Sequence, residues 1–305
     1  MRVAAVQATP VYLDREATVE RAVELIAEAS AAGARLVVFG EAFVAGYPDW
    51  VWRTRPWRDT GWYQLWAEQS VEVPGPATER LGEAARAGGT WVAIGINERA
   101  TNATTVYNSL LYLDDRGEVA GVHRKLMPTG GERLVWGFGD GSDLVAHDTP
   151  VGRVSGLICW ENYMPLARTA VFGLGTSVYL APTWDNSDVW VPTLRHIAKE
   201  GGVYVIGVTP FLRGADVRAA APGLDELYDG DDEWLSRGNT TIVAPGGEIL
   251  AGPLVGEAGI LYADIDPGAA VRQRRMFDVV GHYARSDVFQ LHVNTDPKRA
   301  VSRTD

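Results

Sequence analysis

Short apolar runs alternate with amphipathic stretches along most of the chain. Continuous apolar runs are typical of buried strands, whereas apolar residues at spacings of three and four predict helices with one buried face. In the first half, this pattern predicts a helix after Asp14 and another that follows Pro76 and runs through Ala87. The strands expected there lie at 3–8, 36–39, 91–96 and 109–113, and a turn leads into a hairpin strand at 118–125.

The second half repeats this order of elements without a residue-level repeat. Helices are expected at 166–172 and 191–200, and strands at 154–158, 178–181, 203–208, 240–244 and 260–264. Alternating strands and helices favour α/β layers over a β-sandwich or a helical bundle. Two sheets packed on each other, each covered by helices, would accommodate these elements. No stretch resembles a flexible linker, so we expect a single domain over residues 1–305.

Three stretches interrupt this alternation. Residues 46–76 carry five of the chain's 11 tryptophans, which line an apolar pocket, form a subunit contact or fill an ordinary core. Residues 211–237 are acidic and contain glycines, as is typical of an excursion or a contact loop. The C-terminal tail, residues 266–305, has an aromatic segment that begins at Phe277, and we expect it to dock at an oligomer interface.

The composition argues against several classes of protein. The 39 acidic side chains outnumber the 28 basic ones and give a formal net charge of -11. This balance disfavours nucleic acid or an anionic membrane as the partner, because both are bound by clustered Lys and Arg. A single cysteine makes no internal disulfide and no multi-cysteine metal site. The chain shows no export signal and no apolar run near the roughly 20 residues of a transmembrane helix, so a cytoplasmic protein is expected.

That cysteine is the first candidate for chemistry. Cys159 follows the expected strand at 154–158 and precedes a turn and a helix. Open α/β sheets bind their ligands at the carboxyl ends of strands, and backbone N–H groups in such a turn can stabilise a developing negative charge. The alternative is a buried structural cysteine, a common role for this residue.

A nucleophilic thiol needs a base, because the thiol form reacts poorly. None of the five histidines stands in a familiar Cys–His context; they are His123, His147, His196, His282 and His292. A buried carboxylate with a raised pKa is the other candidate base. Glu41 closely follows the expected strand at 36–39, where an ionisable side chain must be paired, solvated or functional. An ion pair at the end of the sheet is the alternative for Glu41.

Lys125 ends the expected hairpin strand, and Glu132 follows in a loop. A lysine in this place is usually a surface charge, but beside a thiol and a carboxylate it would stabilise an anionic intermediate. Glu132 alone reads as an ordinary loop acid. Because Glu41, Lys125 and Cys159 all fall at the carboxyl ends of expected strands, they can meet at one end of the sheets.

These residues make the chain resemble the nitrilase, or carbon–nitrogen hydrolase, superfamily, whose signature is a Glu, a Lys and a Cys in this order. The matching segments are Gly40-Glu41-Ala42-Phe43, Arg124-Lys125-Leu126-Met127-Pro128-Thr129 and Cys159-Trp160-Glu161-Asn162. The segments that resemble the true nitrilase branch more than the amidase branches are Gly46-Tyr47-Pro48 and residues 132–137, 159–165 and 278–283. Two positions depart from the family pattern: Gly40 replaces a common proline, and Gly130-Gly131 replaces bulkier residues.

The resemblance implies a four-layer αββα sandwich and a mechanism without a metal or an organic cofactor. Glu41 would be the general base and Cys159 the nucleophile, while Lys125 would stabilise the tetrahedral anion together with the backbone N–H of Trp160. Glu132 would orient substrate or water and help to hold Lys125. Trp184 is a candidate pocket residue, because the family places its loop near the substrate.

The implied activity is that of a nitrilase, which converts a small-molecule nitrile and two waters into a carboxylic acid and ammonia. An amidase or carbamoyl-type hydrolase, acting on an amide with the same Glu-Lys-Glu-Cys tetrad, is the nearest alternative. A non-catalytic assembly protein is a more distant one. The resemblance also implies a homodimer or a larger homo-oligomer.

Overall fold

The computed structural model describes residues 1–101 and 104–298, which form two six-stranded sheets and a smaller two-stranded one. The first large sheet has the order β14 (Gly259–Asp264), β1 (Arg2–Gln7), β2 (Ala34–Phe39), β3 (Trp91–Arg99), β4 (Val106–Leu113) and β5 (Val119–Arg124). The second has the order β13 (Ile249–Leu254), β12 (Thr240–Val243), β9 (Tyr204–Val208), β8 (Val178–Pro182), β7 (Gly152–Gly156) and β6 (His147–Thr149). The small sheet pairs β10 (Phe211–Arg213) with β11 (Trp234–Arg237).

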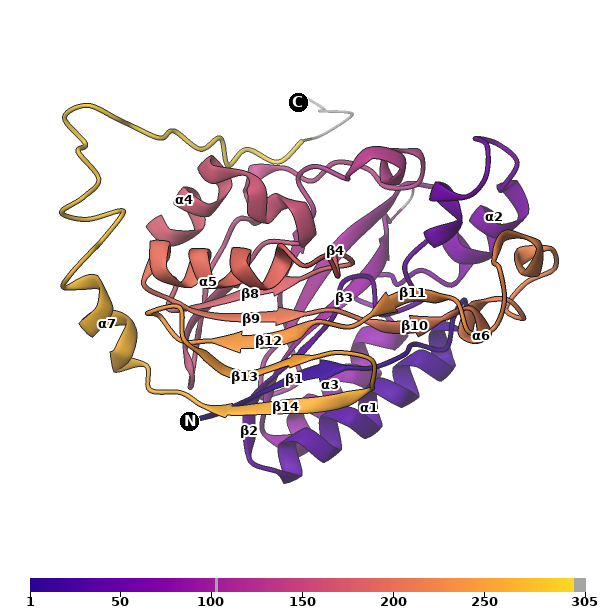
Figure 1. Cartoon of the computed structure of the whole chain (residues 1–305), viewed down its shortest axis with the longest axis horizontal. Helices are drawn as coiled ribbons and strands as arrows, with labels where there is room; N and C mark the ends of the chain where they lie inside the picture. Colours follow the sequence, from indigo (N-terminus) through magenta and orange to yellow (C-terminus); the bar gives the residue numbers. More distant parts are fainter. Residues whose placement is uncertain (102–103, 299–305) are drawn as a thin grey trace, which may run out of the picture.

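Helices cover the outer face of each large sheet. Two long helices, α1 (Arg15–Ala31) and α3 (Pro76–Gly88), lie on one side of the strands, and α4 (Pro165–Gly173) and α5 (Trp190–Gly201) lie on the other (Figure 1). The shorter helices are α2 (Thr60–Glu68), α6 (Gly214–Val217) and α7 (Gly268–Arg274), with 3-10 turns at Asp49–Trp52, Gly130–Leu134, Gly141–Asp143, Cys159–Tyr163 and Leu224–Leu227. The fold is the four-layer αββα sandwich that the resemblance implies.

Three apolar cores separate these four layers. The central core joins the inner faces of the two sheets and includes Val3, Leu36, Val38, Leu180 and Ile206, all at most 1% exposed. Separate cores lie between the first sheet and α1 and α3, and between the second sheet and α4 and α5. Because burial of apolar side chains is the main favourable term in folding, the central core fixes the two sheets to each other.

Several strands differ from the sequence-based expectation. β6 and β13 lie where no strand was expected, and β7 and β14 differ in extent or in pairing. β7 ends at Gly156, before the expected limit of 158. The Leu157 N–H still donates to the Leu180 carbonyl of β8, but the Leu157 carbonyl accepts from the Asn162 side-chain amide. β14 does not extend the second sheet, since it pairs antiparallel with β1 in the first. The order of elements along the chain does not indicate that β14 returns to the first sheet.

Two of the interrupting stretches pack together as one aromatic lobe, defined here as residues 46–76 and 211–237. Arg53 contacts Asp49 at 2.5 Å and Glu233 at 2.8 Å, and the indole of Trp62 donates to the Pro222 carbonyl. The stretch 211–237, expected to be a loop, contains the β10–β11 pair and α6. It lies beside α2 in the aromatic lobe (Figure 1).

The tryptophans of the lobe divide between core and surface. Trp50 and Trp66 are fully buried, Trp52 is about half exposed, and Trp57 is 85% exposed. The cluster is thus partly ordinary core, while the Trp52 ring faces the cavity described below.

After α7 the tail runs as an extended segment past α4 (Figure 1). Val279 and Val280 pack against the core beneath α4 and α5, and the Lys298 backbone N–H donates to the Asp140 carboxylate. Across residues 1–101 and 104–298, no helix is long and apolar enough to cross a membrane.

Candidate active site

Glu41 lies in the turn that follows β2 and is 1% exposed. Its Oε1 accepts hydrogen bonds from Asn108 Nδ2 at 2.7 Å and Lys125 Nζ at 2.8 Å. Its Oε2 accepts one from the backbone N–H of Trp184 at 2.6 Å. The turn rests directly on β3, where a Cβ on Gly95 would stand 2.2 Å from the Gly40 carbonyl oxygen, so only glycine fits there.

Lys125 directly follows β5, and its side chain is fully buried between two carboxylates. Its Nζ lies 2.8 Å from Glu41 Oε1 and 2.7 Å from Glu132 Oε2. Burial alone would lower the pKa of Lys125, but Glu41, Cys159 and Glu132 together raise it above its ordinary value. The ammonium therefore stays charged across the physiological range.

Burial also raises the pKa of Glu41 above its ordinary value; the Lys125 charge opposes this rise and Glu132 adds to it. A carboxylate with a raised pKa accepts a proton more readily than an ordinary glutamate. This is the property that a general base near neutral pH requires.

Glu132 belongs to the 3-10 turn Gly130–Leu134 and is 2% exposed. Its Oε2 also accepts from the backbone N–H of Thr129 at 2.6 Å, and its Oε1 accepts from the Tyr47 hydroxyl at 2.8 Å. Both carboxylate oxygens are thus fixed, and the side chain lines the cavity.

Cys159 is the first residue of the 3-10 turn Cys159–Tyr163 and has a left-handed backbone, with φ at 52°. Such a conformation is unusual outside glycine and is held when the surroundings bond the turn tightly. Here the Asn162 amide donates to the carbonyls of Leu157 and Cys159 at 2.9 and 2.8 Å. The residue as a whole is 4% exposed.

Burial raises the pKa of the Cys159 thiol well above its ordinary value, and Glu41 adds to the rise, while Lys125 and a hydrogen bond with Thr183 oppose it. The sulfur is therefore protonated at neutral pH. It needs a base to become a nucleophile.

The thiol opens into a cavity of about 390 Å³ with largely aromatic walls. The lining residues are Tyr47, Trp52, Thr129, Glu132, Cys159, Trp160, Trp184, Asp185, Asn186 and Ser187. Trp184 stacks on Tyr47 with ring centroids 4.2 Å apart, and the Trp160 indole donates to Asp185 at 2.9 Å. Such walls suit a small, largely apolar ligand.

The structure brings all six sequence-predicted site residues together. Glu132, Cys159, Trp160 and Trp184 line the cavity. Glu41 and Lys125 lie behind them, bonded to Trp184 and Glu132 respectively.

Sequence reasoning missed several contacts of these residues. Tyr47 stood in the Gly46-Tyr47-Pro48 segment but was given no role, although its hydroxyl bonds Glu132. Asn108 is a fully buried polar residue within the otherwise apolar strand β4, a signal that could have marked it. The rim residue Asp185 lies beside Trp184 and carried no separate signal.

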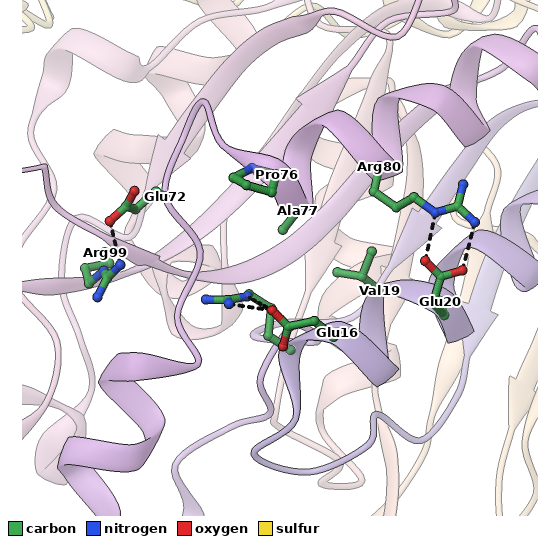
Figure 2. Close-up of a pocket in the computed structure, with 9 residues that line it drawn as sticks. Glu16, Val19, Glu20, Glu72, Pro76, Ala77, Arg80 and Arg99 are labelled. Atoms are coloured by element: carbon green, nitrogen blue, oxygen red, sulfur yellow. Dashed lines mark hydrogen bonds and ion pairs between the residues drawn. The ribbon is translucent and has the colours of Figure 1, made fainter.

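A second cleft, of about 340 Å³, lies where α1 meets the start of α3 and contains paired charges (Figure 2). Arg80 bonds Glu20 at 2.7 Å and Arg99 bonds Glu72 at 2.5 Å, so these arginines are already neutralised. The chain's one cysteine lines the other cavity, so the cavity at Cys159, and not this cleft, is the candidate active site. Throughout the described part of the chain, no group of three or more His, Cys, Asp or Glu is arranged to hold a metal ion.

The fold and the site define a class of enzyme. A family model described as carbon-nitrogen hydrolase matches residues 2–275. The chain belongs to the carbon–nitrogen hydrolase family, as the sequence motifs predicted.

Its relatives place it in the nitrilase branch of that family. It is 45% identical to an aliphatic nitrilase of Sinorhizobium fredii (strain HH103), covering 98% of this chain and 97% of that protein. It is 42% identical to a nitrilase of Bradyrhizobium diazoefficiens, covering 99% and 94%. A bifunctional nitrilase/nitrile hydratase of Nicotiana tabacum is 40% identical, covering 100% and 89%.

Solved structures share the fold at lower identity. An amidase from Nesterenkonia sp. aligns with a TM-score of 0.67 and 24% identity, covering 90% of this chain and 94% of that one. Nit3 of Saccharomyces cerevisiae, described as a member of branch 10 of the nitrilase superfamily, aligns with a TM-score of 0.71 and 21% identity, covering 93% and 96%.

Proposed function

We propose that this protein is a nitrilase that hydrolyses the carbon–nitrogen triple bond of a small organic nitrile to a carboxylic acid and ammonia. One observation carries the proposal: a buried Glu41–Lys125–Glu132 chain stands behind a cavity that is lined by the chain's one cysteine. The identity of 45% to an aliphatic nitrilase, over nearly the full length of both chains, supports the choice of nitriles.

In the first half-reaction, Glu41 takes the thiol proton and the Cys159 sulfur attacks the nitrile carbon. The nitrogen takes up that proton, so the product is a thioimidate bound to the enzyme. Glu41 then removes a proton from water, which adds to the same carbon. The nitrogen leaves as ammonia after it is protonated, and a thioester remains.

In the second half-reaction, another water attacks the thioester carbon with Glu41 again as the base. The carbon–sulfur bond breaks, and the acid is released with the Cys159 thiol restored. The raised pKa of Glu41 suits a group that takes and returns a proton in each half-reaction.

Lys125 and the backbone N–H of Trp160 stabilise the negative charge of the tetrahedral species. Pre-placed donors of this kind contribute on the order of 3 kcal/mol each. Glu132 keeps the ammonium in place through its 2.7 Å contact and orients substrate or water in the cavity. Trp184 forms one wall of the substrate pocket.

A matched pair of substrates tests the proposal: 3-phenylpropionitrile and 3-phenylpropionamide, with ammonia and acid measured for each. We expect acid and ammonia from the nitrile with the wild type and neither product with a Cys159→Ala variant. When the reaction is quenched with acid, mass spectrometry should show an added mass on Cys159. Ammonia from the amide alone would reject the nitrilase in favour of the amidase. Absence of any adduct with nitriles, amides and esters would favour a non-catalytic assembly protein.

We further propose that residues 1–305 act as one domain in a cytoplasmic homo-oligomer, with the tail at 266–305 docked on a neighbouring subunit. Large apolar side chains on the tail support this, since Met276 and Phe289 are 72% and 73% exposed. Light scattering should give a dimer or a larger species, and removal of residues 276–305 should reduce its size. A monomeric full-length chain would contradict the proposal.

A further inference from the structure

A second carboxylate near the candidate nucleophile takes no part in the proposed mechanism. Glu161 is fully buried and lies two residues after Cys159. Its Oε1 accepts from the backbone N–H of Leu126 at 2.7 Å, and its Oε2 accepts from that of Ile158 at 2.6 Å. Leu126 directly follows Lys125, and Ile158 directly precedes Cys159, so one carboxylate joins the two loops.

His123 holds this carboxylate from the other side. Its Nε2 lies 3.1 Å from Glu161 Oε2, and its Nδ1 lies 3.0 Å from Asp143 Oδ1. Asp143 in turn accepts from the backbone N–H of Arg124 at 2.9 Å, the residue that precedes Lys125. The buried Tyr112 and Tyr179 hydroxyls also lie near Glu161, and burial keeps both neutral by raising their pKa. The Arg124 guanidinium lies near Asp143 but is paired with Glu98.

His123 is charged in this setting. Burial would lower the pKa of His123, but Glu161 and Asp143 together raise it to about 10. Both ring nitrogens therefore carry hydrogens at neutral pH and donate to the two carboxylates. Each carboxylate of this cluster thus contacts the imidazolium, so none of its buried charges lacks a partner.

A buried ion pair of this kind is seldom a large net source of stability, because desolvation offsets much of the attraction between its charges. Its contacts instead converge on the peptide units that flank Lys125 and Cys159. These two residues come from different sheets, Lys125 from the end of β5 and Cys159 from the turn after β7. A misplacement of about 1 Å between reacting groups can lower a rate by on the order of 10²-fold.

We propose that Glu161, held by His123 and Asp143, is a positioning residue that sets the separation between the Lys125 ammonium and the Cys159 sulfur. The inference rests on the proposed roles of Lys125 and Cys159. Glu161 touches neither substrate nor reacting atoms, and it acts through the backbone of the two loops.

The test is Glu161→Gln, which replaces one acceptor oxygen with an NH₂ that meets a backbone N–H and so breaks one of the two links. We expect kcat for nitrile hydrolysis to fall by about 10- to 100-fold with KM within about threefold. The rate of Cys159 alkylation by iodoacetamide should fall in parallel. Alkylation needs no nitrile, so it tests the positioning even if the proposed function is wrong.

Asp114→Ala is the control, because both backbone hydrogen bonds of Asp114 end on its Oδ1 and an asparagine would keep them. Asp114 is also a buried carboxylate, and it accepts from two backbone N–H groups, those of Arg116 and Glu118, at the far end of the β4–β5 hairpin. It should cost stability while leaving kcat and the alkylation rate within about twofold of the wild type.

The positioning role is overturned if Glu161→Gln loses stability as the control does but keeps kcat and alkylation near the wild-type values. If Glu161→Gln does not fold, His123→Gln carries the test, because glutamine keeps a donor to Glu161 and removes only the charge and the link to Asp143. Its kcat should fall by about 3- to 10-fold at unchanged KM. An unchanged kcat and alkylation rate in this variant would equally reject the proposal.

Discussion

Two buried clusters at the end of β5 share one design and differ in what they hold. In the first, the Lys125 ammonium lies between Glu41 and Glu132, at 2.8 and 2.7 Å. In the second, the His123 ring lies between Glu161 and Asp143, at 3.1 and 3.0 Å. The two cations are two residues apart, so they project to the same face of the strand.

The difference lies in the other contacts of the carboxylates. In the lysine cluster, Glu132 borders the cavity, and the charges of Glu41 and Lys125 both act on the pKa of the Cys159 thiol. In the histidine cluster, Glu161 and Asp143 accept from backbone N–H groups on the loops around the site. The same arrangement of charges thus holds the proposed reactive groups in one place and the main chain in the other.

The sharpest way to separate the two clusters is Lys125→Met. It leaves Glu41 and Glu132 facing each other without a cation, and losing one partner of a buried pair costs about 3–5 kcal/mol of stability. Nitrile hydrolysis should fall by at least about 10³-fold, since both anion stabilisation and the alignment of Glu41 are lost. Urea unfolding and kcat/KM measure the two effects.

A double variant provides the control for this prediction. Adding Glu132→Gln removes one of the repelling charges, so part of the stability should return while activity stays lost. Activity within tenfold of the wild type in Lys125→Met would refute the role given to the lysine.

The histidine cluster should make stability depend on pH. The pKa of His123 is raised from 6.5 to about 10 in the folded state, so the folded protein binds more protons than the unfolded chain between these values. Its contribution is complete below about pH 6.5 and declines as the pH rises toward about 10. Urea unfolding across this window should show falling stability, with a flatter slope in His123→Gln. An identical slope in both proteins would show that His123 is not the linked group.

Site residues could be predicted from the sequence when a local pattern marks them, and not when their partners are distant along the chain. Glu41, Lys125 and Cys159 could be placed because each lies near the end of a strand that the apolar pattern reveals. Glu132 had no such signal and was found only through the family resemblance. His123 was named among the five histidines without a role. Its partner Glu161 lies in the turn after β7, and only the packing of the two sheets brings them together.

The fold shows the same limit. Local periodicity predicted β1, α1, α3 and α5 closely, and Asp14 caps α1 by accepting from the Ala17 N–H. The pairing of the lobe segments 46–76 and 211–237 could not be predicted, since it depends on long-range contacts such as that between Arg53 and Glu233. No local pattern encodes those contacts.

A smaller loss is expected from Tyr47→Phe. The variant removes the hydrogen bond to Glu132 Oε1 and the acceptor of the Trp52 indole, but it keeps the ring that stacks on Trp184. A hydrogen bond to a charged group contributes roughly 1.5–3 kcal/mol, so kcat/KM should fall by about tenfold or somewhat more. No change in kcat/KM would mean that Lys125 and the Thr129 backbone N–H are enough to keep Glu132 in place.

The smallest effect concerns the charge of the substrate. Among the described residues that line the cavity, the charged side chains are Glu132 and Asp185, and none is basic. We expect 3-phenylpropionitrile to be preferred over 4-(2-cyanoethyl)benzoate, which adds only a carboxylate. Asp185→Asn should narrow that preference by about threefold, because a partly exposed charge contributes at most about 1 kcal/mol. High salt should also narrow the preference for the neutral nitrile in the wild type. If neither Asp185→Asn nor high salt alters this preference, repulsion by cavity carboxylates is not its cause.

Lys125 and Glu41 follow strands of the first sheet, and Cys159 and Trp184 follow strands of the second. The proposed catalytic residues therefore meet at the interface between the two sheets. Neither sheet carries all four residues, so we expect the rate of turnover to depend on how the two sheets pack against each other. We expect a small separation of the two sheets to abolish activity well before the protein unfolds.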